Sequence, residues 1–146
     1  MWSEIIVRYF HFIGIFLVVA SLVGEHLLLK DRLSGKEINR LYRLDGIYAL
    51  GAILTLSMGL LLWLGVGKPA EFYSSNPLVH IKLTLFGVIG LLSIKPSVWY
   101  FKNRKHGASV VVDVPRQLKI LIRAQLALLI VLPFLGTLIS RGIGIK

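Results

Sequence analysis

Four runs of residues carry no charged side chain, and each has the length of all or most of a membrane-spanning helix. They cover residues 9–24, 46–67, 83–94 and 124–140. A helix needs roughly 20 mostly apolar residues to cross the hydrocarbon core, and charged side chains at its ends can reach out to the headgroups. The pattern predicts an all-α integral membrane protein, a single domain with four transmembrane helices at residues 4–29, 44–66, 77–100 and 117–140.

Composition supports this class and excludes others. Hydrophobic residues make up 55% of the chain and charged residues only 16%, a combination that soluble domains do not show. The absence of cysteine excludes disulfides, iron–sulfur clusters and thiolate zinc sites. No P-loop, HExxH or GxSxG motif is present. We do not expect the first apolar run to be a cleaved signal peptide, because Glu25 and His26 stand where small residues would be needed.

The basic residues predict how the chain is oriented. The net charge of +10 comes mainly from two loops, which together contain Lys30, Arg32, Lys36, Arg40, Arg43, Lys102, Arg104, Lys105, Arg116 and Lys119. Loops rich in Lys and Arg stay on the cytoplasmic side. We therefore expect a bacterial inner-membrane protein with both termini in the periplasm. Anionic lipid headgroups are the expected partners of the basic loops, rather than nucleic acid.

Local signals mark the helix ends. Ser34 and Glu37 form a capping-box pattern that predicts the start of the second helix. Asn76 and Pro77 predict the start of the third. The segment 104–113 ("RKHGASVVVD") is predicted to be a short loop.

Prolines and aromatic residues give further expectations. Pro96 predicts a kink or an end in the third span, Pro115 the start of the fourth helix, and Pro133 a kink within it. An aromatic belt at the membrane interface is expected at Trp99, Tyr100 and Phe101.

Helical spacing groups polar and small residues into seams that are expected to face neighbouring helices. The first span has one seam, made of His11, Gly14, Val18, Ser21 and Glu25. The second span has Asp45, Tyr48, Ala52, Thr55 and Gly59. The third span has two adjacent faces, one with His80, Thr84, Gly87 and Gly90 and the other with Lys82, Phe86, Ile89 and Ser93.

Depth along the helices predicts an outer polar layer containing His11, His80 and Lys82, with Met58 at a similar level. Imidazole is a good ligand of haem iron, and a Met thioether can be the second axial ligand. Lys82 or Arg8 could then hold a porphyrin propionate. The alternative is structural: the two cations reach the headgroups and the histidines bind backbone or hydroxyl groups.

An inner polar layer is expected toward the cytoplasmic side. Glu25 and Asp45 are predicted to pair with basic residues, Asp45 with Arg43 or Arg123. The alternative is a proton relay through the two carboxyl groups.

Several stretches resemble a known family. "YFHFIGIFLVVASLVGEHLLL", "RLYRLDGIYALGAILTLSMGLL", "SSNPLVHIKLTLFGVIGLLS" and "LPFLGTLISRGIG" are similar to the bacterial membrane proteins grouped as domain of unknown function 2214. The similarity extends over nearly the whole chain. It implies a membrane protein and no particular activity.

A more distant resemblance is to the HemJ-type protoporphyrinogen oxidases, which are haem b proteins of the membrane. It rests on a first-span His followed by Gly and Ala and on the third-span "KLTLF". In that family a first-span His and a third-span Lys are functionally important. The matching positions are His11 and Lys82, so the resemblance implies His11 as a haem ligand and Lys82 as a candidate catalytic residue.

The leading hypothesis is therefore a small haem-binding or redox-associated membrane protein. One alternative is a non-enzymatic accessory subunit that packs against a larger membrane complex. Another is a transporter or channel with Glu25 and Asp45 on its path, which would require a homo-oligomer because four helices leave little room for a pore.

Overall fold

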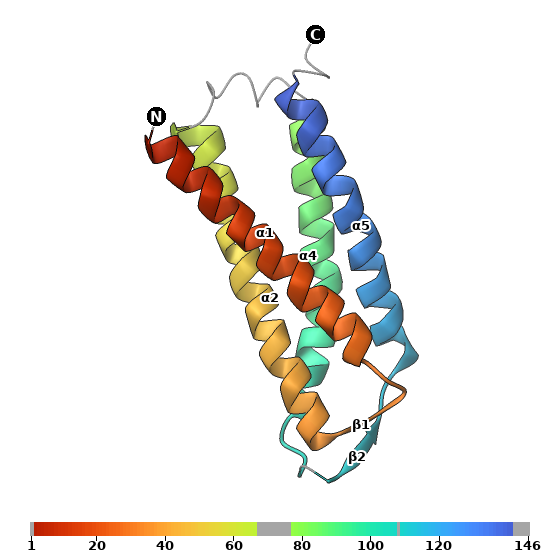
Figure 1. Cartoon of the computed structure of the whole chain (residues 1–146). Helices are drawn as coiled ribbons and strands as arrows, with labels where there is room; N and C mark the ends of the chain where they lie inside the picture. The colour runs from red at the N-terminus through yellow and green to blue at the C-terminus, as the bar shows by residue number, and fades with distance from the viewer. Residues whose placement is uncertain (1, 67–76, 108, 142–146) are drawn as a thin grey trace.

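The computed structural model describes residues 2–66, 77–107 and 109–141, and four long helices dominate them (Figure 1). These are α1 (Trp2–Leu28), α2 (Gly35–Leu61), α4 (Pro77–Asn103) and α5 (Arg116–Ser140). A π-helical turn, η1 (Leu62–Val66), continues α2, and two short strands are β1 (Arg32–Ser34) and β2 (Val111–Asp113). All four long helices are long and apolar enough to cross a membrane. The predicted four-span helical architecture is confirmed.

The helix starts follow the local signals. The Ser34 hydroxyl accepts a hydrogen bond from the Glu37 backbone, and the Glu37 carboxylate accepts one from the Ser34 backbone, so the capping box is formed. This cap starts α2 well before residue 44, where the predicted span begins. Pro77 is the first residue of α4, whereas Asn76 lies outside the described residues. The Pro115 carbonyl accepts a bond from the Leu118 N–H at the start of α5.

Helix α4 does not end at Pro96, and the prediction of an end there was wrong. The helix runs on to Asn103, with Pro96 buried inside it. Neighbouring helices can support the backbone group that a proline leaves unbonded, so proline is tolerated in packed membrane helices. The predicted aromatic belt is also only partly present. Tyr100 is completely buried, while Phe101 is exposed.

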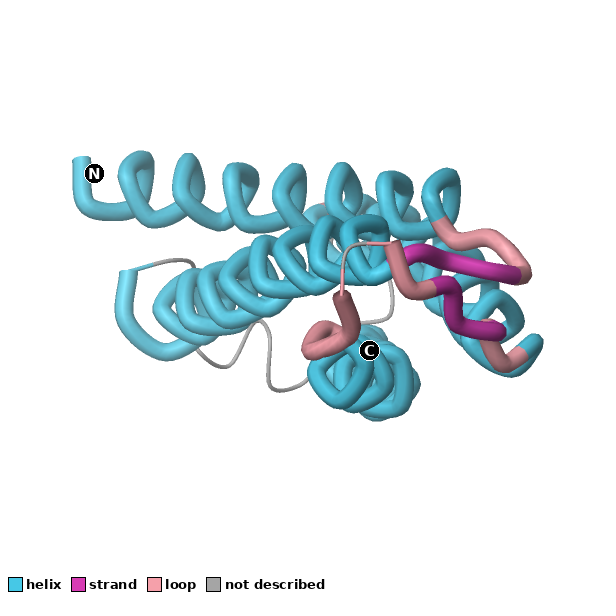
Figure 2. Tube along the Cα trace, turned by 90° about the horizontal axis from the view of Figure 1, so that it is seen from below, coloured by secondary structure: helices cyan, strands magenta, loops and turns pink. Residues whose placement is uncertain are grey.

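The two loops at one end of the molecule are joined by a β-ribbon that was not predicted. β1 pairs antiparallel with β2, with Leu33 opposite Val112 (Figure 2). Leu33 is completely buried beneath the ribbon. The backbone comes very close at its edge, since a Cβ on Gly35 would lie 2.2 Å from the carbonyl oxygen of Gly107. The segment predicted as a loop therefore ends in a strand that ties the two halves of the chain together.

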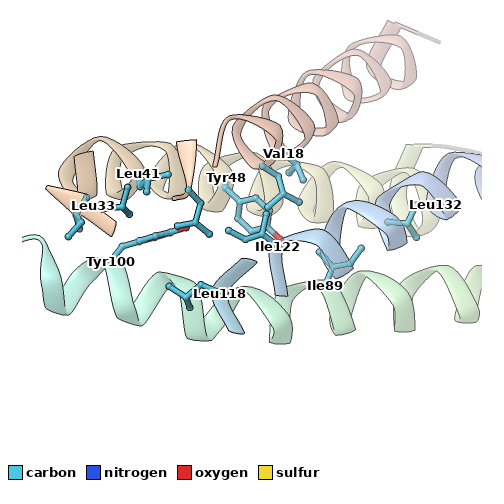
Figure 3. Close-up of a cluster of buried hydrophobic side chains, with 12 residues drawn as sticks. Val18, Leu33, Leu41, Tyr48, Ile89, Tyr100, Leu118, Ile122 and Leu132 are labelled. Atoms are coloured by element: carbon cyan, nitrogen blue, oxygen red, sulfur yellow. The ribbon is translucent and has the colours of Figure 1, made fainter. Parts of the chain in front are cut away.

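The helices pack as two pairs, α1 with α2 and α4 with α5. In the view of Figure 1 the pairs diverge toward the end where α1 begins and α5 ends, and they meet near the ribbon. Most of the buried core lies in the half near the ribbon, where Leu33, Leu41, Tyr100 and Ile122 are almost inaccessible (Figure 3). Large apolar side chains on the outside of every helix are exposed, as expected for surfaces that face lipid: Phe16, Ile53, Leu91 and Ile130 are examples.

Four helix faces were predicted to point toward neighbouring helices, and the prediction is correct for three of them and wrong for one. On α1 the residues Gly14, Val18, Ser21 and Glu25 are all buried. On α2 Tyr48 is buried, and Thr55 lies against Gly14. On α4 the inward face is the one with Lys82 and Ile89, whereas Thr84, Gly87 and Gly90 are exposed. A Cβ on Gly87 or Gly90 would meet nothing within 4 Å. The two glycines of this face therefore make no close contact with the described chain.

Candidate functional site

His11 has a defined orientation in the half of the bundle away from the ribbon. Its Nδ1 lies 2.9 Å from the carbonyl oxygen of Thr55 on α2. A carbonyl can only accept, so Nδ1 carries the proton and Nε2 is left as the ring nitrogen with a lone pair. The ring packs over Gly59, where a Cβ would lie 3.2 Å from the imidazole Cε1. Helix α2 thus holds His11 with its free nitrogen directed away from the Thr55 carbonyl.

Lys82 joins His11 at this level from the other helix pair. It is the charged group that acts most strongly on His11. Its side chain lies between helices, and a Cβ on Gly136 of α5 would be 3.6 Å from the Lys82 Nζ. No ion pair of Lys82 is found among the residues that the structure describes. All four helices therefore contribute to one layer that contains an imidazole and an ammonium group.

The other predicted members of the outer layer lie around this pair. His80 is exposed, and its ring meets that of Trp63 edge-on with the ring centroids 6.1 Å apart. Arg8 is exposed and forms an ion pair with Glu4 at 3.2 Å, so it is directed along the surface of α1. Met58 is half-buried on α2 beside Gly59. The role of Met58 as a second ligand stays a prediction.

The inner layer has a different arrangement from the one predicted. Asp45 lies against Glu25 and Ser97, and no described ion pair joins it to Arg43 or Arg123. Arg123 is exposed, while Gln125 on the same helix is buried. Two residues correspond to about 200° of helix rotation, so the two side chains face opposite ways. The predicted pairing with Arg123 must be corrected to a contact between two carboxyl groups.

Sequence reasoning missed several groups of the inner layer. The Tyr48 hydroxyl donates a hydrogen bond of 2.8 Å to Oε1 of buried Gln125. The fully buried Tyr100 hydroxyl has no hydrogen-bond partner among the described residues. The sequence could have indicated Gln125 as an inward-facing group, because it is an uncharged polar residue next to an apolar run. It could not have indicated Tyr100, because a tyrosine beside two other aromatic residues is typical of an interfacial belt.

Among the hollows on the described surface, two are lined by neither His11, Lys82, Glu25 nor Asp45. One runs along α1 at Ile5, Arg8 and Phe12, and the other lies at Lys95 and Gln117. In the second, the Lys95 ammonium donates a hydrogen bond to the Gln117 side-chain oxygen. No group of three or more His, Asp or Glu side chains that could hold a bare metal ion occurs in the described part of the chain.

The fold and the composition define a multi-pass membrane protein with four helical spans. The chain belongs to the family described as "Predicted membrane protein (DUF2214)", whose model matches residues 3–144. The resemblance to this family inferred from the sequence is thereby confirmed. No curated protein and no solved structure matches the chain.

The donor groups of the outer layer are chemically suited to one end of a haem. A metal-bound histidine usually donates its other ring N–H to a carbonyl or carboxylate, and His11 does this with Thr55. A lysine ammonium is a suitable partner for a propionate, and Lys82 has no described ion pair of its own. If the protein holds the haem predicted from the sequence, His11 would be the residue that holds its iron and Lys82 the residue that holds a propionate; both roles stay predictions.

Proposed function

We propose that this protein binds haem b in the membrane through His11 and has a redox-associated role. The observation that supports this most is the hydrogen bond from His11 Nδ1 to the Thr55 carbonyl. It selects the tautomer in which Nε2 can coordinate iron, and it restrains the ring before any ligand arrives. The nearby ammonium of Lys82 adds a charge of the correct sign for a propionate.

In this proposal each residue has a limited task. A bound haem would supply one-electron chemistry at its iron. Thr55 orients the imidazole through its carbonyl oxygen, and Gly59 leaves the space that the ring occupies. Lys82 attracts a carboxylate from the cofactor and keeps it at the level of His11. His80, which is exposed against Trp63, has a secondary role at most.

The test is an absorbance spectrum of the protein purified in detergent after expression with added haem. We expect a Soret band in the wild type, its loss in His11→Ala and its retention in the matched control His80→Ala. Lys82→Met should fold, since an apolar side chain suits the site. It should bind haem roughly ten- to a hundredfold more weakly, as expected when a charge-assisted bond of about 1.5–3 kcal/mol is removed.

Circular dichroism would establish that each variant is helical. A helical wild-type protein that shows no Soret band, even after titration with haemin in detergent, would overturn the proposal. A Soret band of full intensity in His11→Ala would contradict the assignment of the ligand.

We also propose that the protein lies in the bacterial inner membrane with both termini in the periplasm. The ribbon brings both basic loops to one end of the molecule, and α1 begins and α5 ends at the other end (Figure 1). The positive charge is thus concentrated on a single side, which supports a cytoplasmic location for that side.

A further inference from the structure

The carboxyl groups of Glu25 on α1 and Asp45 on α2 lie side by side in the ribbon half of the bundle. They are close enough to share a hydrogen bond. Glu25 is 2% exposed, and Asp45 is half-buried. An ionised carboxylate only accepts hydrogen bonds, so two carboxyl groups can bond to each other only when one of them holds a proton.

No cation of the described chain neutralises this pair. The ion pairs found use the carboxylates Glu4, Asp31, Glu37 and Asp113, and none uses Glu25 or Asp45. The basic residues nearest to the pair in the sequence are Arg43 on α2, which is exposed, and His26 on α1, which is half-buried. Two unpaired negative charges in an apolar core would be strongly unfavourable. These surroundings therefore favour a state in which at least one of the two carboxyl groups holds a proton.

A third polar group is directed at the pair from α4. The Tyr100 side chain is completely buried and lies in the core (Figure 3). Its hydroxyl faces the Glu25 carboxyl closely enough to interact with it, yet the two do not have the geometry of a hydrogen bond. A buried hydroxyl with no described partner is costly, so the Tyr100 hydroxyl is a donor that can turn to whichever carboxyl group keeps its negative charge when the pair holds a single proton.

The remaining neighbours are already bonded or are neutral. The Tyr48 hydroxyl of α2 donates to Gln125 of α5, and Ser97 of α4 lies against Asp45. The titratable groups that face the carboxyl pair are thus Tyr48 and Tyr100. Helix α5 presents the amide of Gln125, and its Arg123 is exposed.

We propose that Glu25 and Asp45 form a proton-binding site, in which the two carboxyl groups share one proton at neutral pH. Two carboxyl groups match a single proton, whereas a divalent metal ion would take six or more oxygen ligands. Proton exchange occurs on the Asp45 side, because Asp45 is the less buried of the two. The site is separate from the haem site, since Glu25 lies about 20 Å further along α1 than His11 at 1.5 Å per residue. It does not depend on haem binding.

The test is infrared difference spectroscopy of the full-length protein in lipid nanodiscs, with pH as the variable. We expect the carbonyl stretch of a protonated carboxylic acid at neutral pH, shifted in deuterated water. The band should be lost in the double variant Glu25→Gln/Asp45→Asn. It should be unchanged in Asp113→Asn, whose exposed carboxylate pairs with Arg32 at 3.0 Å. Both replacements keep the side-chain size, and the two amides can bond to each other.

A folded wild type that lacks the band at neutral pH would overturn the proposal, and so would a band that persists in the double variant. A band that disappears when sodium replaces choline in the buffer would also overturn it, in favour of a sodium site. If the double variant does not fold, the single replacements decide the matter. A shifted band in either one supports the shared proton, and an unchanged band in both contradicts it.

Discussion

Gly14 and Gly51 are the residues at which α1 and α2 come closest. A Cβ on Gly14 would lie 2.5 Å from the Thr55 hydroxyl oxygen and 2.8 Å from the Thr55 backbone nitrogen. A Cβ on Gly51 would lie 2.9 Å from the Gly14 carbonyl oxygen. Close backbone contact of this kind is how membrane helices pack without a hydrophobic driving force. It also places the Thr55 carbonyl within reach of His11.

Gly14→Ala tests this contact. The added methyl group meets backbone atoms that cannot rotate away, so α1 and α2 must separate, at a cost of roughly 1–3 kcal/mol for overpacking. We expect a lower midpoint of thermal unfolding in detergent, followed by circular dichroism. The matched control is Gly87→Ala on α4, where a Cβ would meet nothing within 4 Å. Equal unfolding temperatures for the two variants would contradict the close packing.

Single residues also show where reasoning from the sequence reached its limit. The depth and the face of His11 and Lys82 follow from helical periodicity, and the structure brings the two together. The neighbour of Asp45 depends on how α5 is rotated about its axis. Because that rotation is determined by the packing of side chains such as Leu118 and Ile122, the sequence did not distinguish Arg123 from Gln125 as the inward residue.

At the level of elements, the helices could be predicted and the ribbon could not. Long apolar runs, a capping box and prolines at helix starts are local signals, and they located all four spans. The pairing of β1 with β2 joins residues about 80 positions apart, for example Arg32 with Asp113, and strands of three residues carry almost no periodicity. The inward face of α4 was also unpredictable, since its two adjacent faces are similarly apolar.

The ribbon is linked to α5 by an ion pair that should respond to acid. The Lys119 ammonium lies 2.5 Å from the Asp31 carboxylate and holds the pKa of Asp31 below its usual value. A lowered pKa in the folded state means stabilisation at neutral pH that is lost as the pH falls through that pKa. We expect Asp31→Asn to lower the unfolding temperature slightly at neutral pH, because Asp31 is exposed. The difference from wild type should vanish in strong acid.

Lys119→Gln provides the control for this ion pair. If the two residues act only through each other, the double variant should be no less stable than either single variant at neutral pH. Fully additive losses would mean that the residues act separately. A pH-independent difference between Asp31→Asn and wild type would show that the carboxylate charge is not responsible.

On the scale of the whole molecule, charge and polarity are divided between the two ends. The end with the ribbon contains the basic loops and, within its core, the Glu25–Asp45 pair. The other half, where the helix pairs diverge (Figure 1), contains His11 against Thr55 of α2 and Lys82 beside Gly136 of α5. A single chain of four spans thus has two separate polar layers, as the sequence predicts. Their connection to a larger complex or to a second copy stays a prediction.

The orientation of the whole chain can be tested with reporter fusions, and both polar layers depend on it. The ribbon forces residues 30–43 and 102–119 to the same side, so their ten Lys and Arg residues act together in determining the topology.

We expect a reporter protein fused after residue 67 to report a periplasmic location. One inserted within residues 102–107 should report the cytoplasm. As a control, replacing Lys102 and Lys105 by Gln should weaken the preference without changing the helices, because both side chains are exposed. The reverse assignment in the wild type would place His11 on the cytoplasmic side and the proton site on the periplasmic side, which would contradict the proposed orientation.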